Sequence, residues 1–277
     1  MKREFPRLPV IRNLGGCGST MLARVIAALP EVVLLSETNP RSAALYGGYM
    51  NPVVQVRNAL PELASSISTF DEHELGYPPR FGELLECLHS SAEKLALNLV
   101  VRDCNYVDFI GIPFVWPVPH DSSLDLAVAG RFFVSAIVLV RHPADQLASL
   151  RSNRAMQGNL TAEHYLNSYF AFLRAMKGTP IFRYEDVVTD PEAYFPQICS
   201  RLGIRWDFNA LERFASIRVA SYQDGITADT ITGNMTRNEE SVICKPIKTD
   251  AASLADEELR RFGAYSDLLI EMGYSAY

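Results

Sequence analysis

The stretch that decides the fold is LPVIRNLGGCGSTMLARVIAALPEVVLL, residues 8–35. Residues 8–14 form a short apolar run of strand length, and a tight glycine-rich turn follows at residues 15–20. Residues 21–29 then place apolar side chains three to four positions apart, the spacing of an amphipathic helix. Residues 32–35 are again apolar and of strand length. The stretch therefore predicts a strand–turn–helix–strand unit, which opens a parallel sheet.

The same alternation of apolar runs and helical spacing continues along the chain. Further strands are expected at 99–103, 134–140 and 180–184, further helices at 54–67, 81–97, 144–154, 162–176, 192–202 and 254–272, and a proline-rich loop at 113–125. The sequence holds no internal repeat and no low-complexity linker. We therefore expect one domain over residues 1–277. Its expected fold is a three-layer α/β/α arrangement with a central, mostly parallel sheet and a P-loop-like strand–loop–helix that binds phosphate.

The composition of the 277-residue chain is that of an ordinary globular protein, with 48% hydrophobic and 21% charged residues. Its net charge of -6 disfavours a nucleic-acid partner, which would need a basic face. The five cysteines are odd in number and include no C-x-x-C pair, so a reducing compartment is expected rather than a disulfide framework. The start of the chain lacks a secretory signal, and no apolar run approaches the roughly 20 residues that span a bilayer. We predict a cytoplasmic protein without a membrane segment.

The glycine-rich turn predicts a phosphate site. Glycines let the backbone bring successive N–H groups close to a phosphate, and the start of the next helix adds N–H groups and partial positive charge. A turn that only joins strand to helix is the alternative. Gly18 is followed by Ser19 instead of the lysine of G-x-x-x-x-G-K-[ST], which disfavours an ATP-dependent enzyme of that type. The residues expected to bind phosphate are Gly15, Gly16, Cys17, Gly18, Ser19 and Thr20.

A second anchor follows the strand at 134–140, in RHPADQLAS at residues 141–149. Ligand sites in open α/β sheets lie beyond the carboxyl ends of the strands, which is where Arg141 is expected. An arginine there can form two hydrogen bonds with a phosphate, and Ser149 can add a hydroxyl. The alternative is an ion pair between Arg141 and a helix carboxylate such as Asp145.

Together these motifs resemble the sulfotransferases that use 3′-phosphoadenosine 5′-phosphosulfate (PAPS). In that family a strand–loop–helix, here GGCGSTML at 15–22, holds the 5′-phosphosulfate, and an R-x7-S pattern, here 141–149, holds the 3′-phosphate. RYEDV at 183–187, with Asp190-Pro191 and LGI at 202–204, and GNMTR at 233–237 follow in the family's order. The resemblance implies that PAPS is the donor, PAP the product and no metal is required. It also places Tyr184 near the adenine, and Asn234 and Arg237 in a loop over the cofactor.

The pattern is most similar to the tyrosylprotein-type branch of that family. LPEVVLLSET at 29–38 aligns with the branch without a gap, which puts Glu37 on the catalytic base. Arg102 and Asp103 fall on the family's Lys-Asp pair, and Arg102 is expected to stabilise charge on the transferring group. Gly16 stands where the family has arginine or lysine. Arg102, Lys245 or Lys248 can supply that cation, and Cys17 stands for the family's serine as a small packing residue.

Several alternatives stay open from the sequence. Glu37 can cap a helix or form a salt bridge, and Arg102 can form a structural salt bridge with Asp103 or another acid; His120 and His164 are alternative bases. An ATP-dependent phosphotransferase and a non-catalytic nucleotide-binding relative are the alternative functions. The acceptor is a hydroxyl of a small molecule or a peptide, and we expect segments 40–78, 105–125 and 155–165 to decide which.

Overall fold

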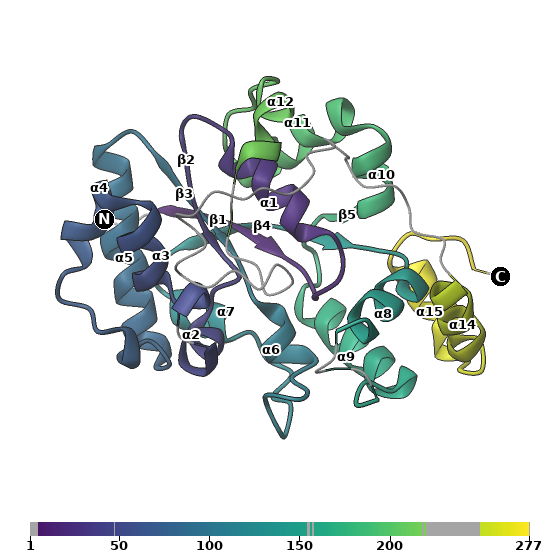
Figure 1. Ribbon diagram of the computed structural model, residues 1–277. Coiled ribbons are helices and arrows are strands. Elements are labelled where there is room, and N and C mark those ends of the chain that lie inside the picture. Colours follow the sequence, from purple (N-terminus) through teal and green to yellow (C-terminus); the bar gives the residue numbers. More distant parts are fainter. Residues whose placement is uncertain are drawn as a thin grey trace.

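The computed structural model describes residues 5–46, 48–153, 156, 158–217, 219 and 250–276. Its centre is a sheet of five strands in the order β2-β3-β1-β4-β5, with every neighbouring pair parallel (Figure 1). The strands are β1 (Arg7–Arg12), β2 (Val32–Ser36), β3 (Asn98–Arg102), β4 (Phe133–Val140) and β5 (Ile181–Arg183). The three-layer α/β fold expected from the sequence is confirmed, and each strand lies within two residues of its predicted bounds at either end.

Successive side chains of each strand enter different cores because a strand alternates faces with a period of two. One face carries Ile11, Val100, Ile137, Leu139 and Phe182, which pack with apolar residues of α1 (Ser19–Ala27), α11 (Pro191–Leu202) and α12 (Ala210–Arg213). The opposite face packs on α3 (Pro52–Ala59), α5 (Pro78–Lys94) and α7 (Ser123–Val128) at one end. At its other end it packs on α6 (Asn105–Phe109), α8 (Pro143–Arg151) and α9 (Ala162–Ala175). Helices therefore cover both faces of the sheet (Figure 1).

Three predicted segments differ in detail from the structure. The helix expected at 54–67 is divided into α3, α4 (Pro61–Ala64) and the short helix η2 (Ser65–Ile67), because Pro61 has no amide hydrogen to continue α3. The helix expected at 254–272 is two helices, α14 (Asp250–Leu259) and α15 (Ala264–Glu271). The proline-rich loop expected at 113–125 ends earlier, because α7 begins at Ser123 with Ser122 as its N-cap.

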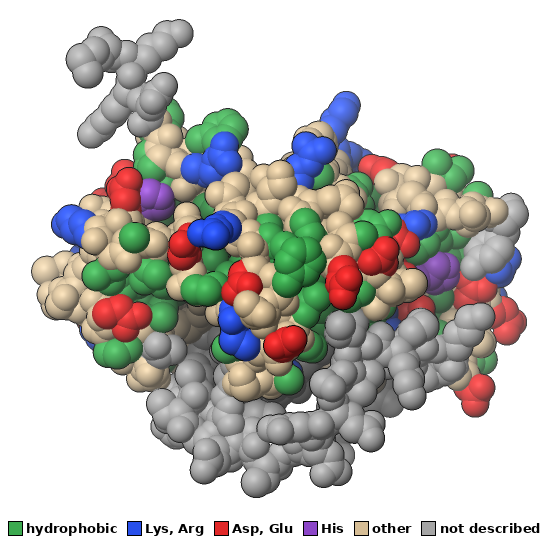
Figure 2. Space-filling model, turned by 90° about the horizontal axis from the view of Figure 1, so that it is seen from above, with side chains coloured by type: hydrophobic (Ala, Val, Ile, Leu, Met, Phe, Trp, Pro, Cys, Tyr) green, Lys and Arg blue, Asp and Glu red, His purple; other side chains and the backbone are tan. Residues whose placement is uncertain are grey.

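The remaining elements are short helices and turns of the connections. They are α2 (Pro40–Tyr46), η1 (Gly48–Met50), η3 (Glu72–Glu74), α10 (Tyr184–Thr189) and η4 (Phe214–Ser216). Within the described parts of the chain, no helix combines the length and the apolar character needed to cross a bilayer. The face in Figure 2 shows acidic and basic side chains interspersed around a hydrophobic area.

The sheet topology brings the predicted site residues to one edge. Because all five strands are parallel, their carboxyl ends lie at the same edge, and a predicted site residue follows or ends each of them. The glycine-rich loop follows β1, Glu37 follows β2, Arg102 ends β3, Arg141 follows β4 and Tyr184 follows β5. The parallel topology thus brings residues that are more than 160 positions apart in the sequence to the same edge of the sheet.

Candidate functional site

A pocket opens at this edge and contains most of the predicted site. Its lining includes the predicted residues Gly15, Gly16, Gly18, Ser19, Thr20, Glu37 and Ser149. The other lining residues are Asn13, Met50, Asp103, Cys104, Tyr106, Phe114, Leu150, Asn153 and Met156. The structure therefore brings the loop after β1, the residue after β2 and the second half of α8 around one space.

The glycine-rich loop is built to present amide groups. Gly16 and Gly18 have φ angles of 78° and 83°, in the left-handed region that glycine adopts without steric cost. Helix α1 follows with Gly18 as its N-cap, no side-chain cap and no acidic residue in its first turn. The first N–H groups of a helix have no partner within it, and they carry the positive end of the helix dipole. The loop is thus suited to an anion such as a phosphate.

Cys17 contributes to this loop through its backbone rather than its side chain. The residue is fully buried and packs in the core with Leu22 and Tyr184. Burial raises the pKa of its thiol to about 11, so the thiol is neutral at physiological pH.

Side chains of Arg141 and of α8 hold three carbonyls of the loop by hydrogen bonds. The Nε2 of the buried Gln146 donates to the carbonyl oxygens of Gly15 at 2.8 Å and of Leu14 at 3.3 Å. Arg141 Nη1 donates to the carbonyl oxygen of Gly16 at 3.2 Å. In a planar trans peptide the N–H points opposite to the C=O. Fixing three successive carbonyls therefore orients the three amides that follow them.

Tyr184 joins the loop to Arg141. A Cβ at Gly18 would lie only 2.2 Å from the Tyr184 ring, so only glycine allows the ring to pack there. The Arg141 guanidinium lies 5.3 Å from the centre of the same ring, in a cation–π contact. Arg141, Tyr184 and the glycine-rich loop thus form one unit, although they follow three different strands.

The structure gives a local reason for glycine at position 16, where a cation is absent. A Cβ there would meet the Leu150 Cγ at 3.2 Å and the Gln146 carbonyl oxygen at 3.3 Å. A side chain would also be strained by the positive φ of this residue. The close packing of α8 against the loop and the positive φ therefore disfavour a lysine or arginine at this position.

A cation reaches the loop from β3 instead. Arg102 Nη1 donates to Thr20 Oγ1 at 3.2 Å, and Arg102 Nη2 lies 2.6 Å from Glu37 Oε1. The Arg102 side chain is fully buried, whereas 17% of the Glu37 side chain is exposed. The three residues join the ends of β2 and β3 to the first turn of α1 at the wall of the pocket.

The backbone around Glu37 is held in an unusual conformation. Glu37 has a φ of 53°, which is uncommon for a residue with a side chain. The side-chain amide of Gln55 forms two hydrogen bonds with the backbone of Ser36, the residue before Glu37. Its oxygen accepts from Ser36 N and its nitrogen donates to Ser36 O, both at 2.8 Å. After Glu37, Thr38 N donates to the Arg102 carbonyl at 3.1 Å. Such conformations cost free energy and persist only where the surroundings enforce them, often at functional sites.

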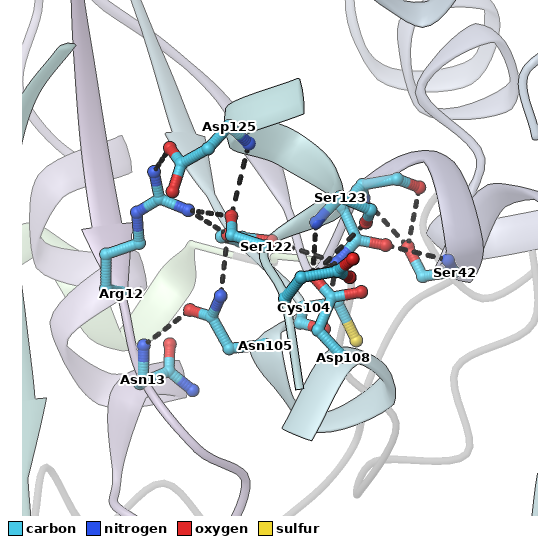
Figure 3. Close-up of polar contacts among 12 residues, drawn as sticks. Arg12, Asn13, Ser42, Cys104, Asn105, Asp108, Ser122, Ser123 and Asp125 are labelled. Atoms are coloured by element: carbon cyan, nitrogen blue, oxygen red, sulfur yellow. Dashed lines mark hydrogen bonds and ion pairs between the residues drawn. The ribbon is translucent and has the colours of Figure 1, made fainter. Parts of the chain in front are cut away.

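Behind the pocket wall lies a buried polar network of residues from β1, α2, α6 and α7 (Figure 3). Arg12 forms ion pairs with Asp103 and Asp125 and donates to Ser122 Oγ at 3.0 Å. Asp103 also accepts from the side-chain amides of Asn39 at 3.0 Å and Asn105 at 2.8 Å. Asp103 thus pairs with Arg12, and the ion pair of Arg102 is with another acid, Glu37, as the salt-bridge alternatives for Arg102 and Glu37 allowed.

A second carboxylate completes this network. Asp108 forms an ion pair with Arg41 at 2.7 Å and accepts from Ser123 N at 2.9 Å and Ser123 Oγ at 3.1 Å. Burial, followed by repulsion from Asp103, raises the pKa of Asp108 to about 7. Burial likewise raises the pKa of Asp103. The network thus links the end of β1, which leads into the glycine-rich loop, to the segment after Glu37 and to the start of α6.

The alternative bases are elsewhere. Neither His120 nor His164 lines the pocket, and His164 Nε2 lies 2.8 Å from the Ile110 carbonyl oxygen. Asn234 and Arg237, and also Lys245 and Lys248, lie outside the described residues.

Sequence reasoning missed Gln146 and Arg12. An isolated glutamine in a helix and an arginine at a strand end carry no local signal of these contacts.

Comparison with solved structures finds the same fold in sulfotransferase domains. One is the sulfotransferase domain of the olefin synthase from Synechococcus PCC 7002, with a TM-score of 0.52 and 18% identity over 93% of this chain and 96% of that one. Another is the sulfotransferase domain of the curacin biosynthetic pathway, with a TM-score of 0.53 and 15% identity over 94% and 99% of the two chains. No protein-family model and no curated protein sequence matches this chain. The chain thus has the α/β fold of sulfotransferase domains over nearly its whole length.

Proposed function

We propose that this protein is a sulfotransferase that moves a sulfuryl group from PAPS to an acceptor hydroxyl, with Glu37 as the general base. The observation that carries the proposal is the Glu37–Arg102–Thr20 cluster, in which Glu37 and Thr20 line the same pocket as the glycine-rich loop and the buried Arg102 bonds to both. An acceptor hydroxyl must lose its proton as it attacks sulfur, and a partly exposed carboxylate beside an anion-binding loop suits that task. The fold of the sulfotransferase domains supports the same reaction class.

Each described site residue has a role in this proposal. The amides of residues 16–20 bind the 5′-phosphosulfate, and Arg102 with Thr20 stabilises the charge that grows on the leaving phosphate. Ser149 and Arg141 hold the 3′-phosphate, and Tyr184 lies beside the adenine. Asn234 and Arg237 remain predicted cofactor contacts from the sequence pattern alone. PAPS supplies the activated sulfuryl group, and no step of the proposal uses a metal.

The arrangement of Asp103 favours sulfuryl transfer over ATP-dependent phosphoryl transfer. Magnesium would need a carboxylate with available oxygens at this sheet edge. Asp103 is the carboxylate in the expected place, and its oxygens accept from Arg12, Asn39 and Asn105. The absence of a lysine after Gly18 points the same way.

Two sequence-based expectations form part of the proposal. Residues 1–277 make a single sulfotransferase-like domain, and the protein acts in the cytoplasm on a small-molecule or peptide hydroxyl.

The non-catalytic alternative was suggested by Gly16. The position of Arg102 beside Thr20 argues for catalysis, because it supplies a cation at the loop from another strand.

Replacement of Glu37 by glutamine tests the base. Glu37→Gln should lower kcat for PAP formation by about 100-fold to 10,000-fold, because glutamine cannot accept the proton. Its affinity for PAP, measured by calorimetry, should stay within about twofold, since the shape and the hydrogen bond to Arg102 are largely kept. Glu31→Gln is the matched control, at an exposed position just before the amino end of β2. Unchanged turnover in Glu37→Gln would reject Glu37 as the base.

Arg141→Ala tests the nucleotide site with the same calorimetry. Loss of a charged donor should weaken PAP binding by about 10-fold to 100-fold. Unchanged PAP affinity would count against the 3′-phosphate site. Tight binding of ATP with magnesium, without binding of PAP, would instead indicate the phosphotransferase.

A further inference from the structure

We propose that the acceptor is an uncharged hydrophobic alcohol or phenol, and not an acidic peptide. This inference rests on the proposed function and concerns the same pocket. It follows from the lining residues outside the glycine-rich loop and Glu37. Six of them are apolar, namely Met50, Cys104, Tyr106, Phe114, Leu150 and Met156, and four are polar, namely Asn13, Asp103, Ser149 and Asn153.

The six apolar residues form an apolar wall. Four of them, Met50, Tyr106, Phe114 and Met156, come from the three segments that we expected to decide the acceptor. The Tyr106 hydroxyl donates to the Ile112 carbonyl oxygen, so its polar atom is already bonded to the backbone. Tyr106 therefore offers the pocket its ring rather than its hydroxyl.

The apolar wall is part of the protein core and not a loose surface patch. Met50, Tyr106, Leu150 and Met156 are buried in one core cluster, and the partly buried Phe114 packs against it. The loop that carries Phe114 is closed by hydrogen bonds from Phe114 N and Val115 N to the Gly111 carbonyl, both at 2.8 Å. A wall fixed in this way favours ligands that bury apolar surface against it.

The charges around the pocket disfavour an anionic acceptor. Glu37 and Asp103 are the charged residues of the lining, and both are acidic. Each has its arginine partner behind it, Arg102 for Glu37 and Arg12 for Asp103, and both arginine side chains are nearly or fully buried. Among the described residues, no lysine or arginine lines the pocket. A carboxylate on the acceptor would therefore face like charges in a partly desolvated space.

The test compares an uncharged acceptor with its carboxylated analogue and with an acidic peptide. PAP formation at fixed PAPS is measured with 2-naphthol, with 6-hydroxy-2-naphthoate and with a tyrosine peptide flanked by glutamates. We expect kcat/KM for 2-naphthol to exceed that for the naphthoate and the peptide by about tenfold or more. Equal or greater values for either anionic acceptor would overturn the inference.

A pair of variants tests whether the apolar wall sets the preference. Phe114→Arg places a cation in the lining at a partly exposed position and should reduce the preference for 2-naphthol at least about tenfold. Trp116→Arg adds the same charge two residues away, at a side chain that is 80% exposed and outside the lining, and should leave the preference within about twofold. An equal effect of both variants, or none in Phe114→Arg, would contradict the role of the apolar wall.

Binding measurements separate this inference from the proposed function. The affinities of both naphthols in the presence of PAP are obtained from naphthol fluorescence, which needs no turnover. Absence of PAP binding and of PAPS cleavage with every acceptor would reject the proposed function. Normal PAP binding with equal affinities for the two naphthols would reject only the acceptor class.

Discussion

Two clusters of charged residues lie at the carboxyl edge of the sheet, and they differ in how they meet solvent. In the pocket cluster, Glu37 pairs with Arg102 and keeps 17% of its side chain exposed. In the buried polar network, the side chains of Arg12 and Asp103 are 2% and 0% exposed, and several donors surround each carboxylate. Glu37 and Asp103 both line the pocket, so the comparison shows that they differ in exposure and in the number of surrounding donors, and not in bearing a carboxylate directly after a strand.

The contrast is sharpest at two adjacent residues. Arg102 and Asp103 follow one another at the end of β3, and they belong to different clusters. Backbone alternation at a strand end turns neighbouring side chains in opposite directions. Arg102 is therefore directed to the loop and Glu37, while Asp103 meets Arg12 from β1.

The largest stability effect should come from breaking the buried polar network. Arg12→Met leaves the buried Asp103 without its counter-ion and should lower the free energy of unfolding by about 3–5 kcal/mol. Arg131→Met is the matched control, because its ion pair with Glu86 is largely exposed and should contribute less than about 1 kcal/mol. Urea unfolding followed by circular dichroism measures both.

A milder variant keeps this prediction testable if Arg12→Met does not fold. Ser122→Ala removes one hydrogen bond from Arg12 and the N-cap of α7, with an expected loss of about 1–2 kcal/mol. A loss in Arg12→Met no larger than that in Arg131→Met would show that the buried polar network is not structurally important.

An intermediate effect is expected where a buried side chain supports the pocket. Gln146→Met keeps the volume but removes the donor to the carbonyls of Leu14 and Gly15, so the loop amides lose their fixed orientation. We expect a stability loss of about 1–3 kcal/mol and PAP binding weakened about tenfold. Calorimetry with PAP at a temperature where the variant is folded gives the affinity.

Tyr165→Phe separates the two contributions of Gln146. It removes only the hydroxyl that donates to Gln146 Oε1 at 3.1 Å and leaves the loop contacts intact. Stability should fall by about 1 kcal/mol with PAP affinity within about twofold. Equal losses of PAP affinity in Tyr165→Phe and Gln146→Met would argue against a specific role of Gln146 in orienting the loop.

The smallest effect on stability should come from a partly exposed ion pair that belongs to neither cluster. Arg151 on α8 contacts both carboxylate oxygens of Glu258 on α14, at 2.5 and 3.0 Å, and this hydrogen bonding lowers the pKa of Glu258. A folded-state pKa below the ordinary value of 4.5 gives stability that is present above that pH and is lost as the pH falls below it. Because the pair is partly exposed, Glu258→Gln should cost less than about 1 kcal/mol at pH 7.

Urea unfolding between pH 3 and pH 7 checks this prediction, and the difference between the two proteins should vanish at the acid end. Glu257→Gln is the control, because the Glu257–Arg261 pair is 71% exposed on both sides and 3.5 Å apart. A difference for Glu258→Gln that is independent of pH would show that its effect is not the ion pair.

Much of this organisation could be read from local patterns. Apolar runs placed all five strands, and the glycines marked the loop, in which Gly16 and Gly18 adopt the positive φ angles that its turns need. Arg141 could be proposed because residues that follow parallel strands share one edge, and Glu37 from the resemblance of residues 29–38 to the tyrosylprotein-type branch. Helix bounds were less accurate at 54–67, where Pro61 interrupts the expected helix, and at 254–272, where two helices stand in place of one.

By itself, then, the sequence determined the parallel α/β fold, the glycine-rich loop and the edge at which the pocket forms, because these depend on periodicity and on chain order. Only the tertiary structure decided which charges meet. In the folded chain Arg102 forms an ion pair with Glu37, and Asp103 is buried with Arg12. Met50, Tyr106, Phe114 and Met156 line one side of the same pocket. Such contacts join segments tens of residues apart, and they depend on side-chain direction and packing rather than on any local signal.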